Sequence, residues 1–85
     1  MKSFTYTIKD KIGIHARPAG LLAKKAATFK SDITIEINSK KADSKRLFAL
    51  MGLNVKHGDT IAVNISGEDE AEAENALKNF LAENL

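Results

Sequence analysis

The sequence predicts an α+β fold in which an open antiparallel sheet carries helices on one face. Three segments alternate apolar and polar residues with a period of two, as half-buried strands do. Two others repeat apolar residues at helical spacing, and a short apolar segment between them predicts a further helix. With one further short strand the order is strand, helix, strand, strand, helix, strand, helix. One-sided elements bury their apolar faces in two layers, so we expect the 85 residues to form a single domain, residues 1–85.

Four strands account for the extended segments. Residues 3–9 alternate strictly, and residues 33–38 and 60–66 repeat the pattern with isoleucine and valine. A short strand at residues 40–43 is expected to pair with the second strand through a tight turn at Asn38–Ser39. Periodicity does not determine the order of strands in the sheet, and a split βαβ arrangement is the natural family of solutions.

The first two helices carry start and stop signals. We expect the first over residues 16–29, with Pro18 in its first turn, where a backbone N–H has no helical partner. We expect the second over residues 45–51, with Ser44 as its N-cap and Gly52 as its stop.

The third helix is expected over residues 69–83, behind an acidic run. Glu68, Asp69 and Glu70 stand where carboxylates complement the positive end of the helix dipole. We therefore interpret the acidic run as a solvated helix entrance.

Composition excludes several functions. The net charge of +2, from 13 basic and 11 acidic residues, is too small to demand a polyanion. There is no cysteine, no apolar run long enough to span a membrane, no signal-like amino terminus and no metal-ligand spacing, so we expect a cytoplasmic protein without metal or membrane insertion. No glycine-rich nucleotide loop is present, so we expect no cofactor.

The segment GIHARPAG, residues 13–20, carries the chemistry. His15 falls between the first strand and the first helix, beside the N–H groups of Ala16 and Arg17, which favour an anion. The Arg17 guanidinium suits phosphate oxygens, and a neutral imidazole is a competent nucleophile. Gly13 and Ala16 are expected to keep the approach uncrowded. Two interpretations stay open: His15 is a structural cap, or it carries a phosphoryl group that a partner must supply.

The segment RLFALMGL, residues 46–53, is too apolar for a short helix with one buried face. We expect part of it to be exposed as a protein contact rather than fully embedded. Gly20, Leu21 and Lys24 lie off the core stripe of the first helix, on the side that continues from Arg17.

GIHARPA and KRLFALMGL resemble the two motifs of HPr, the histidine-containing phosphocarrier family of the bacterial phosphotransferase system. The resemblance covers the whole chain and implies an open-faced β-sandwich, a sheet of order 1-4-2-3 with three helices on one face. It implies a carrier, not an enzyme, in which His15 accepts a phosphoryl group at Nδ1 from enzyme I and passes it to IIA domains of sugar permeases. Arg17 would stabilise the phosphate. The implied partner surface comprises Gly20, Lys24, Arg46, Leu47, Phe48 and Met51, on a monomer.

Two residues depart from the family pattern. Ile12 stands where a small polar residue usually assists the phosphate, so one side-chain contact is missing. Arg46 stands where many relatives carry a regulatory serine, which suggests a carrier locked in its docking-competent state.

Three alternatives to sugar transport remain. An HPr-like regulatory binding module and a nitrogen-type phosphorelay carrier are both compatible with these motifs. A nucleic-acid-binding domain is disfavoured, because the basic pairs at residues 24–25, 40–41 and 45–46 form no stripe and lack stacking aromatics.

Overall fold

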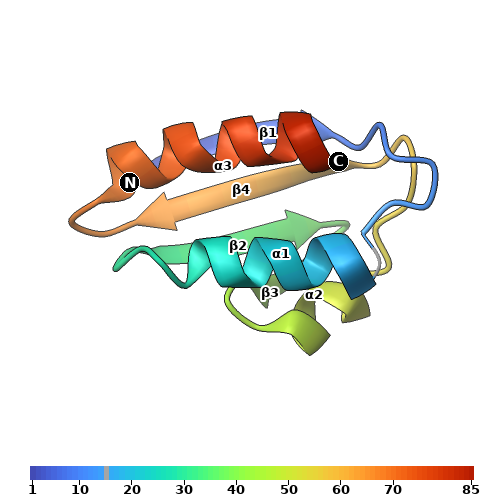
Figure 1. Cartoon of the computed structure of the whole chain (residues 1–85), viewed down its shortest axis with the longest axis horizontal. Helices are drawn as coiled ribbons and strands as arrows, with labels where there is room; N and C mark the ends of the chain where they lie inside the picture. Colours follow the sequence, from blue (N-terminus) through green and yellow to red (C-terminus); the bar gives the residue numbers. More distant parts are fainter. Residues whose placement is uncertain (15) are drawn as a thin grey trace.

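A computed structural model describes residues 1–14 and 16–85 as a four-stranded antiparallel sheet with three helices on one face (Figure 1). The elements are β1 Lys2–Thr7, α1 Ala16–Ala26, β2 Asp32–Ile37, β3 Lys40–Asp43, α2 Leu47–Gly52, β4 Thr60–Ser66 and α3 Glu70–Asn84. The strand order is β1-β4-β2-β3, which confirms the fold that the family resemblance implied and that periodicity left open.

The core lies between the sheet and the helices. On β2 and β4, Ile33 pairs with Ile65 and Ile35 with Val63, and all four side chains are buried. The helices complete this core with one buried stripe each, through Ala19, Leu22 and Ala26 of α1, Leu50 of α2, and Ala73, Leu77 and Leu81 of α3. The predicted alternation is therefore confirmed by which residues are buried.

The tight turn between β2 and β3 is also confirmed. Asn38 and Ser39 have φ values of +47° and +69°. Two successive positive φ angles are what a two-residue hairpin loop requires to match the twist of its strands.

The first helix is shorter than predicted. Regular α-helix ends at Ala26, because the amides of Thr28 and Phe29 bond to carbonyls three residues back, those of Lys25 and Ala26. The Thr28 hydroxyl also donates to the Lys25 carbonyl at 2.7 Å. Side chain and backbone compete for the same carbonyl, which closes the helix with a tight turn.

The predicted boundaries of the second helix are wrong at both ends. The helix begins at Leu47 with Arg46 at the N-cap position, and Ser44 is fully buried with its hydroxyl unpartnered among the described residues. Gly52 lies inside the helix, and the chain turns away at Asn54, whose φ is +54°. Asparagine tolerates this left-handed conformation, so Asn54 ends the helix in place of glycine.

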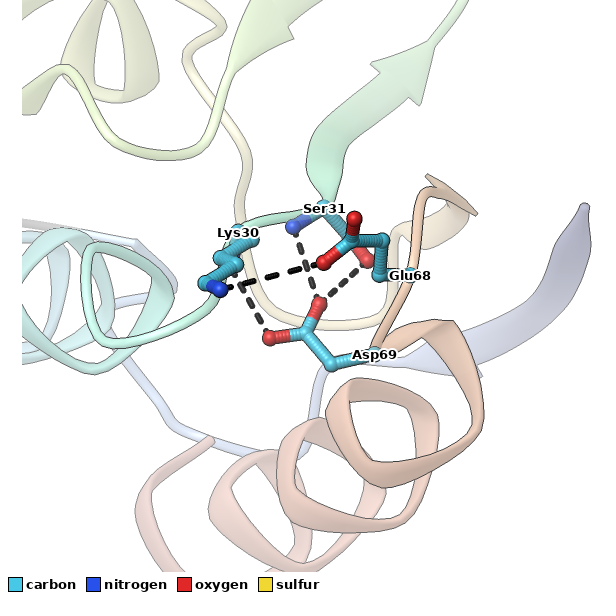
Figure 2. Close-up of polar contacts among 4 residues, drawn as sticks. All are labelled: Lys30, Ser31, Glu68 and Asp69. Atoms are coloured by element: carbon cyan, nitrogen blue, oxygen red, sulfur yellow. Dashed lines mark hydrogen bonds and ion pairs between the residues drawn. The ribbon is translucent and has the colours of Figure 1, made fainter.

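The acidic run is more than a solvated helix entrance. The Asp69 carboxylate accepts hydrogen bonds from the Lys30 amide at 2.9 Å, the Ser31 amide at 2.9 Å and the Ser31 hydroxyl at 2.5 Å (Figure 2). These bonds, led by the one from the Ser31 hydroxyl, lower the pKa of Asp69 to about 2. Asp69 thus joins the start of α3 to the turn that enters β2.

Candidate functional site

The loop between β1 and α1 leads to the predicted phosphorylation motif at one end of the molecule (Figure 1). Its last described residue before the helix, Ile14, is buried and donates its amide to the Val55 carbonyl at 3.0 Å. His15 itself lies outside the described residues. The loop is therefore anchored to the segment after α2 right up to the position before His15.

Gly13 makes that anchor possible. Its φ is +85°, and a Cβ atom there would lie 2.6 Å from Lys56 Cα and closer still to the Val55 carbonyl oxygen. No L-residue side chain fits this contact between two backbones. The sequence predicts that Gly13 keeps the approach to His15 uncrowded, and that expectation falls on a residue outside the described ones. The structure shows another role, since Gly13 is buried and its missing side chain serves the packing of two loops.

Asp10 organises the same loop, and the sequence analysis missed it. Its carboxylate accepts the Ile12 amide at 2.9 Å, and its carbonyl accepts the Gly13 amide at 3.2 Å. The Asp10 amide in turn bonds to the Leu85 oxygen at 2.8 Å, which attaches the loop to the end of α3. An aspartate two residues before a turn is the sequence signal that could have revealed this role.

The start of α1 offers unpaired donors. Ala16 and Arg17 are exposed, the first turn holds no acidic residue, and within the described chain no backbone bond outside the helix engages the N–H group of either residue. Pro18 is buried in this turn and has no N–H to satisfy. The partial positive charge of the helix end is therefore unneutralised by the described residues.

Three basic side chains that the sequence analysis assigned to the phosphate site or to the partner surface are also unpaired within the described chain. None of the ion pairs formed by residues 1–14 and 16–85 involves Arg17, Lys24 or Arg46. Arg17 borders a shallow hollow of about 240 Å³. The lining consists of Asp10, Arg17, Pro18, Leu21, Glu83 and Asn84. An exposed guanidinium with no committed partner is suited to a transient anion.

The segment of residues 46–53 divides its apolar residues between core and surface, as its composition predicted. Leu50 and Leu53 are buried, whereas Phe48 is 82% exposed and Met51 is 37% exposed. Leu47 is half-buried. Leu21 on α1 is 43% exposed and Ile12 in the loop before α1 is 66% exposed, so both segments add to the exposed apolar surface. The contribution of Ile12 to this apolar surface was not anticipated.

The position of Ser44 bears on regulation. The family resemblance led us to expect a regulatory serine at position 46, where this chain has Arg46. Ser44 is fully buried, so its hydroxyl is not accessible as a substitute. Its neighbour Lys45 donates from Nζ to the Phe29 carbonyl at 3.0 Å and so fixes the entry to α2 against the end of α1.

No helix in the described part of the chain is long and apolar enough to cross a membrane. Residues 1–14 and 16–85 contain no group of three or more His, Cys, Asp or Glu side chains placed to hold a metal ion.

These features define the class of protein. It is a small open-faced α+β domain. Within the described residues it presents basic side chains without ion pairs, unpaired N–H groups at the start of α1, and exposed apolar side chains on α1, on α2 and in the loop before α1. Such a surface suits brief contact with other proteins around a small anion.

Comparison with known proteins gives the family. A family model described as the PTS HPr component phosphorylation site matches residues 2–83. The phosphocarrier protein HPr of Mycoplasma genitalium is 42% identical over 85 residues, which cover 99% of this chain and 97% of that protein. A solved structure of a mycoplasma histidine-containing phosphocarrier protein matches with a TM-score of 0.94 and 38% identity, covering 96% of this chain and 93% of that one. Crh, a catabolite-repression protein of Bacillus subtilis solved as a domain-swapped dimer, matches with a TM-score of 0.78 and 35% identity over 94% of this chain and 92% of its own.

The chain therefore belongs to the HPr family of the phosphotransferase system. It is a phosphocarrier in that relay and not an enzyme.

Proposed function

We propose that His15 accepts a phosphoryl group from phosphorylated enzyme I and passes it to IIA domains of sugar permeases. A lone pair on the imidazole Nδ1 forms a bond to phosphorus while the bond from phosphorus to the donor breaks. The reverse exchange with the acceptor restores the free ring. The observation that carries the proposal is the set of unpaired donors that follow His15 in the chain, at the start of α1.

The phosphoryl oxygens would be held by few groups. The N–H groups of Ala16 and Arg17 and the Arg17 guanidinium are the donors next to residue 15, and they neutralise charge without acid–base chemistry. Ile12 adds no polar atom on its flank, where its exposed side chain is hydrocarbon. A carrier must release what it accepts, and a site with few donors suits that reversibility.

The partner surface would combine α1 and α2. Its residues are Gly20, Lys24, Arg46, Leu47, Phe48 and Met51. Gly20 supports the assignment, because a Cβ atom there would meet nothing of the chain within 4 Å, so packing does not require glycine at this helical position. A glycine costs a helix roughly 0.5–1 kcal/mol, and a flat surface against a partner is a reason to keep it. The exposed Phe48 and Met51 with basic neighbours suit an acidic, apolar partner face.

The decisive experiment is transfer of labelled phosphate from phosphoenolpyruvate through enzyme I. We expect an acid-labile, base-stable phosphate that His15→Ala abolishes. His57 is the other histidine of the chain, and a His57→Asn variant should still be labelled. Equal labelling of His15→Ala and the parent protein would show that the site assignment is wrong.

A regulatory binding module is the second candidate, and the similarity to Crh favours it. The intact His15 favours transfer. We propose a cytoplasmic monomer that serves sugar uptake, with a nitrogen-type relay as the alternative acceptor set. Rapid labelling by enzyme I without onward transfer to any sugar IIA domain would favour the alternatives.

A further inference from the structure

Two loops that are far apart in the sequence are tied together beside the phosphorylation motif. The Ile8 amide bonds to the Asp59 carbonyl at 2.9 Å, and the Gly58 amide bonds to the Ile8 carbonyl at 2.9 Å. Further along, the Ile14 amide bonds to Val55 at 3.0 Å. The backbone ties thus bracket residues 9–13, and one side chain acts between them.

That side chain is His57, in a turn that fixes its position. The Lys56 amide donates to the Asp59 carboxylate at 2.9 Å, and the Asp59 amide returns a bond to the Lys56 carbonyl at 3.0 Å. Gly58 supplies the positive φ of +87° that closes the turn. The backbone on both sides of His57 is therefore held by hydrogen bonds that do not involve its ring.

The ring reaches the loop that leads to residue 15. His57 Nδ1 lies 3.2 Å from the carbonyl oxygen of Lys9 and 3.2 Å from that of Asp10. Carbonyl oxygens only accept hydrogen bonds, so the contact requires the proton to be on Nδ1. A ring protonated only on Nε2 would instead direct a lone pair at two oxygens.

The two carbonyls belong to residues that also support the rest of the loop. The Lys9 and Asp10 amides bond to the Leu85 oxygen at 2.6 and 2.8 Å, and Asp10 holds the amides of Ile12 and Gly13. His57 therefore adds a donor to a segment that other hydrogen bonds already attach to Leu85 and close into a turn.

We propose that His57 is a positioning residue for phosphoryl acceptance. By donating from Nδ1 to the Lys9 and Asp10 carbonyls, it holds residues 12–14 so that the acceptor meets the donors at the start of α1. The proposal rests on the proposed function, in which His15 is that acceptor. His57 touches neither the phosphate nor the partner in this role.

The test compares His57→Leu, which removes the donor and keeps bulk, with His57→Asn, whose Nδ2 stands where Nδ1 was. We expect His57→Leu to lower kcat for acceptance from phosphorylated enzyme I about fivefold, the worth of one ordinary hydrogen bond. KM should change less than about twofold, because Phe48 and Met51 are untouched. His57→Asn should restore kcat to near the parent value.

Amide hydrogen exchange is a second readout that needs no partner protein. Exchange at Ile12 and Gly13 should quicken about fivefold in His57→Leu and not in His57→Asn. The matched control is Thr60→Val, which removes the 3.0 Å hydroxyl bond between Thr7 and Thr60 at the adjacent strand ends. That variant should leave both exchange and kcat unchanged.

Three results would overturn the proposal. They are parent-like kcat and exchange in His57→Leu, equal loss in His57→Asn, and a nitrogen NMR spectrum of the unmodified protein that places the neutral-ring proton on Nε2. The spectrum decides the matter even if His57→Leu does not fold. If His15 is never labelled, the proposed function fails, while the exchange data still decide whether His57 holds the loop.

Discussion

The two ends of the sandwich are both closed by a glycine at a close backbone contact, and they differ in whether their charged groups have partners. At each end a glycine allows two backbones to touch, Gly13 against Val55 and Lys56, and Gly67 against Ser31. A Cβ on Gly67 would lie 2.6 Å from Ser31 Cα. Close approach of this kind is open to glycine alone, so neither junction has room for a side chain at that position.

The two ends differ in how many of their charged groups have partners. At the Gly67 end the Asp69 carboxylate accepts three hydrogen bonds from Lys30 and Ser31, and Lys30 also pairs with Glu68 at 3.8 Å (Figure 2). At the Gly13 end, within the described residues, Arg17 and the first N–H groups of α1 have no such partner. Satisfied charge stabilises a junction, whereas unsatisfied charge beside a junction is available to a ligand.

The largest expected effect comes from filling the two glycine contacts. Gly13→Ala and Gly67→Ala should each lower the free energy of unfolding by about 2–4 kcal/mol, from backbone strain and overpacking together. Among folded molecules only Gly13→Ala should slow phosphoryl acceptance, by roughly tenfold, because it displaces the loop before His15. Urea unfolding and enzyme I kinetics measure the two effects.

Gly52→Ala is the control for these variants. A Cβ at Gly52 would meet nothing within 4 Å, and the position is helical, so this change should stabilise slightly. If Gly67→Ala slows acceptance as much as Gly13→Ala does, the two ends are not functionally distinct.

The next effect concerns uncommitted charge. Arg46→Glu should raise KM for loading by enzyme I about three- to tenfold, more at low salt, because a rim cation steers an acidic partner. Lys30→Glu makes the same charge change at a residue outside the proposed partner surface, where the side chain is 80% exposed and only its amide serves Asp69. Its KM should stay near the parent value. Equal rates for Arg46→Glu and the parent would contradict a carrier held in its docking-competent state.

The smallest effect is confined to acid. Because hydrogen bonds depress the pKa of Asp69 from 3.8 to about 2, the charged form stabilises the fold above pH 3.8, and this contribution is lost as pH falls toward 2. Asp69→Asn has no carboxylate to titrate. The difference in unfolding free energy between parent and variant should therefore shrink steadily from pH 4 to pH 2, as followed by urea titrations.

Comparing the two proteins cancels the titration of other carboxylates, including Glu70, whose pKa is lowered by its hydrogen bond to the amino terminus. Parallel curves for parent and Asp69→Asn would show that the Asp69 junction gains nothing from its charge.

The sequence alone determined the element order, the buried stripes and the β2–β3 turn, because each depends on periodicity or on local backbone preference. It also identified GIHARPAG and the surplus apolar residues of α2. Helix ends were less predictable: Ser44 has the chemistry of a cap, yet the chain enters α2 at a different point and buries it.

Contacts between distant segments needed the tertiary structure. Asp69 looked like one of three solvated acids until the fold brought Ser31 and Lys30 to it. Nothing in the sequence indicates that residues 9–13, with Asp10 and Gly13, meet residues 55–59, with His57, because these contacts join residues more than forty positions apart. Local pattern thus determined what each segment is, and the packing of loops decided which segment holds the phosphorylation motif in place.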